Sequence, residues 1–352
     1  MEGLEEKLKG LSLARRSLPE EPTYLLDVAL QPAGLLAVAC SNFTIHLHNK
    51  DTLSLVGQYQ GHSGPLCGVV FSHTSPDSLY SGSADGTVRG WDVRRPGSEA
   101  VQVFKSGPSH NYCSFDLNCS DTLLCAGTEQ VNDEDSFLVF WDVRKPGGKL
   151  LGVYSESHSD DITQPGGEDE ALLATCNSDS SAGSVCWSGA EFTQLLCLSH
   201  DEGLHLWDLG QLDTDEPLTI FSTSDARGLP LLADGGGVDY LVGCRWLQEA
   251  QRLLVVGGKN SGDLHLMECD HAGLRLLRTL EGGHSSTVRC FLWDAAGEAL
   301  FTGGEDAQLL LWKPGGEELT SGKSKSKKSE SALRLKSRLH KKHGYQREKK
   351  GA

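Results

Sequence analysis

The sequence predicts an all-β fold built from one repeated unit, and two observations carry this prediction. A 33-residue stretch from Gly61 to Val93 recurs near the C-terminus, between Gly282 and Pro314, with nearly the same internal spacing. In both copies, short β-prone runs are separated by turn residues such as Asp, Gly and Ser. A unit of this length that recurs with fixed spacing indicates a repeat architecture.

Each copy of the unit holds one histidine, one hydroxyl residue, one aspartate and one tryptophan. In the first copy, Asp85 lies 23 residues after His62, four after Ser81 and six before Trp91. We expect the aspartate to accept a hydrogen bond from the histidine, the histidine from the hydroxyl, and the hydroxyl from the indole. Such a chain of bonds would stabilise one sheet. The corresponding residues of the second copy are His284, Thr302, Asp306 and Trp312.

A Ser-His-Asp set is also the residue set of a hydrolase, so catalysis is the alternative interpretation. The set occurs twice at the same place in the repeat, which one catalytic site would not require, and a triad is defined by geometry rather than by residue types. The run GGKNSG at 257–262 lacks the first glycine and the final hydroxyl residue of a phosphate loop. No cysteine pair has zinc-ligand spacing, and the acidic turns lack the calcium-loop pattern. We therefore expect no catalytic residue, metal, cofactor or small-molecule substrate.

The repeated unit, with Gly-His at its start and Trp-Asp near its end, resembles the Trp-Asp (WD40) repeat over roughly residues 11–315. The resemblance implies a β-propeller, a ring of four-stranded blades that binds other proteins without catalysing a reaction. Seven blades of roughly 42 residues would need about 300 residues, so the length fits a seven-blade plan.

Taken in order, residues 1–10 are expected to be disordered. The last repeat ends at Trp312 with three strands of its own, and we expect residues 11–17, LSLARRS, to supply the missing outer strand. The first repeat, near residues 23–49, is degenerate. The third repeat extends its turn between Thr128 and Asp135, and such turns often carry contacts. Glu134 in this turn is therefore a candidate contact, although a merely solvated loop is the alternative.

The fourth repeat is expected to begin near His158 and to be truncated within residues 155–175. The 66 residues that separate Trp141 from Trp207 are too many for one repeat and too few for two. Trp187 fits the first strand of the following repeat. The sequence thus predicts either six full blades or an imperfectly closed ring. This departure from the family resembles the product of alternative splicing with impaired ring closure.

Charge is distributed unevenly along the chain. The net charge is −16, but the segment from Lys323 to the end carries 12 Lys/Arg and 2 Glu, a net of +10, which leaves −26 on the remainder. The chain lacks an apolar run long enough for a membrane span, and its charged N-terminus does not fit a signal peptide. Eleven cysteines without a Cys-x-x-Cys pair suit reduced thiols. We expect a nuclear or cytoplasmic protein that is not secreted and does not bind membranes.

Two functions fit these observations. The first is a non-catalytic protein-interaction scaffold in the nucleus or cytoplasm. It is expected to be a monomer within a complex, with the strand-end residues Arg289 and Glu305 as candidate contacts. The alternative is a nucleic-acid-associated or ribosome-assembly factor. Residues 316–352 are expected to form a disordered tail that contacts an import receptor or RNA, with a merely solubilising tail as the alternative. Its clustered cations are Lys323, Lys325, Lys327, Lys328, Arg334, Lys336, Arg338, Lys341 and Lys342.

Overall fold

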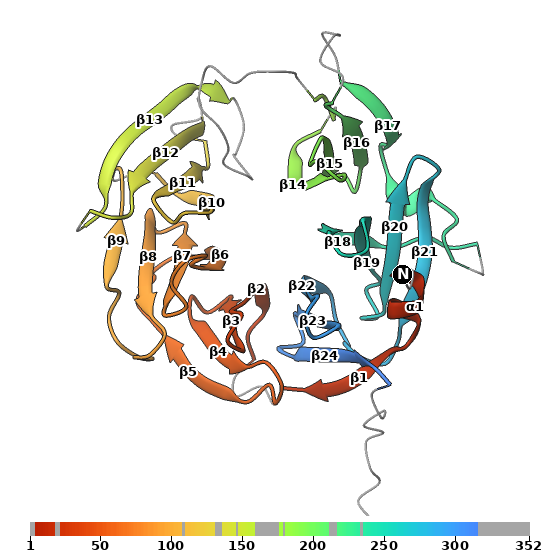
Figure 1. Cartoon of the computed structure of the whole chain (residues 1–352), viewed down its shortest axis with the longest axis horizontal. Coiled ribbons are helices and arrows are strands. Elements are labelled where there is room, and N and C mark those ends of the chain that lie inside the picture. Colours follow the sequence, from red (N-terminus) through yellow and green to blue (C-terminus); the bar gives the residue numbers. More distant parts are fainter. Residues whose placement is uncertain are drawn as a thin grey trace, which may run out of the picture. The chain divides into compact units, whose positions relative to one another are not determined.

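The computed structural model describes residues 4–17, 22–107, 110–130, 136–145, 147–158, 176–178, 180–210, 217–232 and 235–315. These residues form six four-stranded sheets that follow one another around a ring (Figure 1). We call the sheets blades 1 to 6 in chain order. Six full blades are one of the two outcomes that the sequence predicts. A seventh sheet is absent from the described residues.

In each of blades 1 to 5, four consecutive strands pair antiparallel in sequence order. Blade 1 consists of β2 (Leu25–Leu30), β3 (Leu35–Cys40), β4 (Ile45–Asn49) and β5 (Leu55–Tyr59), and blade 2 of β6 (Leu66–Phe71), β7 (Ser78–Ser83), β8 (Thr87–Asp92) and β9 (Gln102–Phe104). Blade 3 consists of β10 (Tyr112–Leu117), β11 (Leu123–Thr128), β12 (Ser136–Asp142) and β13 (Lys149–His158). Blade 4 consists of β14 (Ala182–Ser188), β15 (Gln194–Ser199), β16 (Leu204–Asp208) and β17 (Leu218–Thr223), and blade 5 of β18 (Tyr240–Leu247), β19 (Arg252–Gly258), β20 (Leu264–Asp270) and β21 (Gly273–Leu280).

Blade 6 is built from both ends of the described chain. It contains β22 (Val288–Asp294), β23 (Ala299–Gly304) and β24 (Leu309–Pro314), and β1 (Leu11–Arg16) pairs antiparallel with β24 as its outer strand. In this register Leu13 lies opposite Trp312. The pairing gives hydrogen-bond partners to the backbone N–H and C=O groups at the outer edge of β24, which would otherwise be exposed and unpaired.

The N-terminal residues differ from the disorder expected for residues 1–10. Residues Leu4–Lys9 form the short helix α1, and the Leu8 side chain is 0% exposed. Leu8 packs into the hydrophobic cluster between blades 5 and 6, and Lys7 forms an ion pair of 2.9 Å with Glu298. Burial of Leu8 in this cluster holds the helix on the ring. The expectation of disorder rests on the charged composition of the segment, which does not show that one leucine is buried. One 3-10 turn, η2 (Ala226–Gly228), connects blades 4 and 5.

Apolar side chains pack between neighbouring blades, because alternate residues of each strand point to opposite faces of its sheet. Separate buried clusters join blade 1 to blade 2, blade 2 to blade 3, blade 4 to blade 5, blade 5 to blade 6, and blade 6 to blade 1. Among the described residues, no such cluster joins blade 3 to blade 4. Figure 1 shows these two blades further apart than the other neighbours.

The expected start of a fourth repeat at His158 is wrong. His158 ends β13, the outer strand of blade 3, and lies opposite Ser136 in the register. The next described strand begins at Ala182, so 23 residues separate the two strands, whereas blade 1 spans 35 residues. The interval is too short for another blade of this size. The truncated repeat within residues 155–175 falls mainly on residues 159–175, which lie outside the described residues.

Candidate binding surfaces

A chain of hydrogen bonds links four side chains within blade 2. The indole N–H of Trp91 donates to the Ser81 hydroxyl at 2.8 Å, and Nε2 of His62 lies 2.8 Å from the same oxygen. Nδ1 of His62 lies 2.9 Å from Asp85. The Ser81 oxygen accepts the indole proton, so the Ser81 hydroxyl donates its own proton to Nε2 of His62. His62 therefore carries its proton on Nδ1 and donates it to the Asp85 carboxylate. All four polar groups thereby find partners inside the sheet.

The turn that carries Asp85 is a tight hairpin between β7 and β8. Gly86 has a φ of 76°, in the left-handed region that favours glycine, and a Cβ there would approach the His110 carbonyl oxygen at 2.8 Å. The Asp85 carboxylate also accepts from the backbone N–H of Ser63 at 3.0 Å. Burial raises the pKa of Asp85, but hydrogen bonds from His62, Thr87 and Ser63 outweigh it and bring the pKa below its usual range.

Blade 6 contains the same chain of side chains. The Trp312 indole donates to the Thr302 hydroxyl at 2.9 Å, and Nε2 of His284 lies 2.8 Å from that oxygen. Nδ1 of His284 lies 3.0 Å from Asp306. Burial raises the pKa of Asp306, but the hydrogen bond and charge of His284, together with backbone hydrogen bonds from Ser285 and Gln308, bring the pKa below its usual range. In both blades these side chains bond to one another within the sheet.

Blade 3 keeps the tryptophan but lacks the hydroxyl. Trp141 lies opposite Leu124 as Trp91 lies opposite Leu79, which places Ala126 at the position that Ser81 holds in blade 2. The Trp141 side chain is 0% exposed, and its indole nitrogen has no hydrogen-bond partner among the described residues. This blade therefore has an unsatisfied buried donor.

A central cavity of about 440 Å³ lies where the inner strands β2, β6, β14, β18 and β22 come together. Arg289 lines it and forms a hydrogen-bonded ion pair with Glu305, with 2.8 Å between Nε and Oε1. The structure thus pairs two of the three predicted contact residues, and one of them, Arg289, lines this cavity. Glu134 and the nine tail cations lie outside the described residues.

Two charged residues of the cavity wall were not predicted. Asp27 on β2 accepts hydrogen bonds from the backbone N–H groups of Val69 at 2.9 Å and Val28 at 2.8 Å. Burial raises its pKa, and these two bonds oppose the rise. Arg245 on β18 is exposed, and no carboxylate among the described residues forms an ion pair with it. The sequence does contain a signal that could have indicated both residues. Each is the single charged residue of an otherwise largely apolar run, TYLLDVAL for Asp27 and YLVGCRWL for Arg245.

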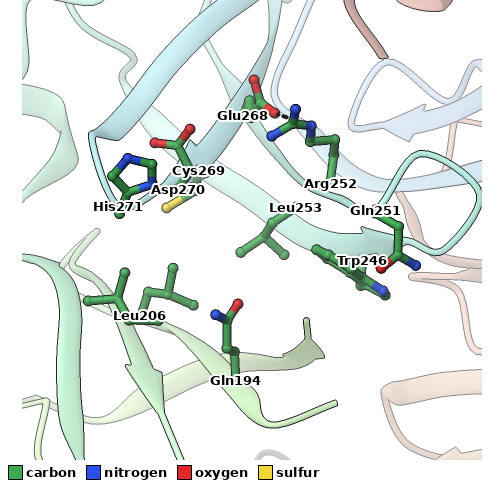
Figure 2. Close-up of a pocket in the computed structure, with 11 residues that line it drawn as sticks. Gln194, Leu206, Trp246, Gln251, Arg252, Leu253, Glu268, Cys269, Asp270 and His271 are labelled. Carbon is green, nitrogen blue, oxygen red and sulfur yellow. Dashed lines mark ion pairs between the residues drawn. The ribbon is translucent and has the colours of Figure 1, made fainter. Parts of the chain in front are cut away.

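A smaller pocket of about 180 Å³ lies between blades 4 and 5, and Figure 2 shows its lining. Leu206, Leu253 and Trp246 form apolar walls. Glu268, which is buried, accepts from Arg275 at 2.6 Å and pairs with Arg252 at 3.2 Å, so its charge is neutralised within the protein. The pocket therefore offers an apolar recess beside a satisfied ion pair.

The described residues lack two further kinds of feature. These residues contain no cluster of His, Cys, Asp and Glu that could hold a metal ion. The part of the chain that the structure describes also contains no helix that is both long and apolar enough to cross a membrane.

Comparison with known proteins agrees with the repeat architecture. Residues 53–92 and 274–313 match the family model described as WD domain, G-beta repeat. The chain is 28% identical over 324 residues to WD repeat-containing protein GTS1 of Arabidopsis thaliana, a match that covers 79% of this chain and 78% of the relative. It is 23% identical over 322 residues to the WD repeat-containing protein 89 homolog of Dictyostelium discoideum, with 84% of each covered. The chain therefore folds as a β-propeller that carries WD40 repeats, and over most of its length it is similar to WD repeat-containing proteins.

Proposed function

We propose that this protein is a non-catalytic scaffold that binds a partner protein at the central cavity. WD-repeat propellers generally bind other proteins, because rigid blades present loops and strand ends of free composition. One observation carries the assignment to the cavity: Arg245 and Arg289 line it together with the largely buried Asp27. A partner that inserts an acidic side chain would find the uncompensated cation of Arg245, and a charge-assisted bond to arginine is among the stronger polar contacts.

The proposal is tested by affinity purification and mass spectrometry of the full chain and of the variant Arg245→Glu/Arg289→Glu. The matched control is Arg94→Glu, because this arginine is 66% exposed in the turn after β8 and does not line the cavity. We expect proteins that copurify with the wild type and the control to be lost from the double variant. Retention of every partner by a double variant with an unchanged melting temperature would place the binding surface elsewhere.

A second function, contact with nucleic acid or an import receptor through residues 316–352, is supported by the charge of the sequence. The segment from Lys323 onward has a net charge of +10 against −26 for the rest of the chain. Clustered cations attract phosphates without needing a fold, and such binding weakens as salt increases. A nuclear location follows if an import receptor reads the same clusters. The composition also fits a role in ribosome assembly, where RNA and basic proteins occur together.

Deletion of residues 320–352 separates these tail functions from that of the ring. If the tail binds RNA, ultraviolet crosslinking to RNA in cells falls to background after the deletion. If it targets the protein, the truncated chain moves from the nucleus to the cytoplasm. Crosslinking and location that both persist would show that the tail serves neither purpose.

We further propose that the chain lacks most of one repeat of a seven-blade plan and is the product of alternative splicing. Support comes from the 23-residue interval between β13 and β14 and from the lack of a hydrophobic cluster between blades 3 and 4 in the described residues. Sequencing of transcripts tests this: a longer form should add the remainder of a blade between residues 158 and 182. A single transcript form without such an addition would contradict it.

A further inference from the structure

Two cysteines from different blades meet at the inner edge of the ring. Cys186 lies on β14 of blade 4 and Cys244 on β18 of blade 5, and a hydrogen bond connects their thiols. Both side chains pack against the same buried cluster between the two blades. The next residue after Cys244 is Arg245, whose charge acts on Cys186. The pair therefore bridges an interface between elements that are far apart in sequence.

The two thiols differ in acidity. The hydrogen bond from Cys244 lowers the pKa of Cys186 against the opposing effect of burial, and the charge of Arg245 lowers it further. The same bond, together with burial, raises the pKa of Cys244. Burial instead raises the pKa values of Cys197 and Cys269, the other cysteines near this cluster. A thiolate is the nucleophilic form of cysteine, so Cys186 is the reactive member.

The central cavity gives a small oxidant access to the pair. Cys244 and Arg245 line this cavity of about 440 Å³, as does Val185, the residue before Cys186. The cavity thus borders Cys244 directly and the strand residue next to Cys186. A peroxide molecule is small enough to enter a space of this volume, whereas a protein thiol is not. These positions favour oxidation within the pair over exchange with another chain.

We propose that Cys186 and Cys244 are a peroxide-sensitive pair that closes into a reversible disulfide between blades 4 and 5. The Cys186 thiolate attacks one oxygen of hydrogen peroxide, the O–O bond breaks, and the second oxygen leaves as water after taking up a proton. The resulting sulfenic acid is attacked by the Cys244 sulfur, which forms the S–S bond and releases a second water. In total, two thiols are oxidised and one peroxide is reduced to two waters. A dithiol reductant reverses the step.

The disulfide would hold one of the two blades that, among the described residues, share a hydrophobic cluster with a single neighbour. Among the described residues, blade 4 shares a hydrophobic cluster with blade 5 and with no other blade. The bond would close a loop with 57 residues between the two cysteines. Closing such a loop restricts the unfolded chain and raises stability. Oxidation would thereby stabilise the junction of blade 4 with the ring.

The test treats the full chain with micromolar hydrogen peroxide, blocks the remaining thiols and maps digested peptides by mass spectrometry without reduction. We expect one cross-linked species that joins the peptides of Cys186 and Cys244 and disappears on reduction. It should be absent from Cys186→Ser and from Cys244→Ser. It should remain in Cys119→Ser and Cys197→Ser, which remove one exposed and one buried thiol outside the pair.

A second readout separates the disulfide from general oxidative damage. The melting temperature of the oxidised wild type should exceed that of the reduced protein by several degrees. Oxidation should not raise it in the two pair variants. The proposal is overturned if Cys186 accumulates as sulfinic acid without a cross-link, or if the cross-link mainly joins other cysteines. Peptide mapping of the wild type alone decides this if a variant fails to fold.

Discussion

The indole nitrogen of Trp91 lies 2.8 Å from the hydroxyl oxygen of Ser81, and both side chains are almost completely buried. The same oxygen lies 2.8 Å from Nε2 of His62. One hydroxyl therefore satisfies two buried nitrogen atoms. It is the central element of the hydrogen-bond chain in blade 2, and removing it would leave both nitrogens unpaired.

The first prediction concerns this hydroxyl. Ser81→Ala should lower the free energy of unfolding by about 1–3 kcal/mol, because it leaves a buried indole N–H and an imidazole nitrogen without partners. Urea unfolding followed by tryptophan fluorescence measures the loss. Thr302→Ser in blade 6 is the matched control, since it keeps the hydroxyl, and it should cost less than Thr302→Ala. A loss below about 0.5 kcal/mol for Ser81→Ala would contradict the role of the network.

The second prediction reverses the first in blade 3. Ala126→Ser places a hydroxyl at the position of Ser81 and offers the Trp141 indole its missing partner. We expect the free energy of unfolding to rise by about 0.5–1.5 kcal/mol. Leu124→Ser, which adds a hydroxyl two residues earlier on the same strand, should instead destabilise the protein. An unchanged or reduced stability for Ala126→Ser would show that the site cannot accommodate the oxygen.

The third prediction is a dependence of stability on pH. The pKa of Asp85 is lower in the folded protein than in the unfolded chain, so its contribution is present at neutral pH and lost as the pH falls toward the folded pKa. Asp85→Asn should therefore destabilise the protein by about 1–2 kcal/mol at pH 7. The difference from wild type should shrink below about pH 4.

The control for this experiment is Asp51→Asn, because the Asp51 side chain is 65% exposed. Its effect on unfolding at pH 7 should be small, as for most exposed substitutions. Equal effects of Asp85→Asn at neutral and acidic pH would show that the carboxylate charge contributes no stability.

The fourth prediction concerns the N-terminal segment. Deletion of residues 1–18 removes β1 and α1, exposes the edge of β24 and uncovers the cluster that contains Leu8 and Leu11. We expect a marked fall in melting temperature. Leu11→Ala alone should cost about 2–5 kcal/mol, because this side chain is buried. Glu6→Ala, at an exposed position of α1, should have little effect. An unchanged melting curve for the deletion would show that blade 6 does not depend on β1.

The fifth prediction compares two tryptophans at the same register in different blades. Trp187 lies opposite Leu195 in blade 4 and is 51% exposed, whereas Trp293 lies opposite Leu300 in blade 6 and is 7% exposed. Trp293 packs against blade 5, but no described blade covers the corresponding face of blade 4. Trp293→Ser should cost about 3–5 kcal/mol, and Trp187→Ser less than about 1 kcal/mol. Equal losses in urea unfolding would show that Trp187 is covered in solution.

Much of the architecture follows from local patterns in the chain. The spacing of His62, Asp85 and Trp91, repeated near the C-terminus, predicts the family and the all-β fold, because tight hairpins and alternating strands are encoded by neighbouring residues. The same repeat spacing, applied along the chain, predicts six full blades as one of two outcomes, and the structure has six four-stranded sheets. It fails at His158, where an outer strand continues through a segment that resembles the start of a new repeat.

The candidate sites show the limit of local patterns. Arg289 and Glu305 stand 16 residues apart, and a hairpin brings them together as an ion pair. Asp27, Cys186, Cys244 and Arg245 come from three different blades, and nothing in their immediate sequence indicates that they share one region of the ring. Leu8 likewise gains its partners only from blades 5 and 6.

From the sequence alone come the repeat, the hydrogen-bonding side chains of blades 2 and 6, the shortened interval before Ala182 and the contrast in charge between ring and tail. These depend on spacing and composition, which the chain displays directly. The tertiary structure decides which thiols meet, which carboxylates become buried and which face of blade 4 has no neighbour among the described residues. Those properties depend on the closure of strands far apart in sequence, because burial and contact arise only when the blades pack against one another.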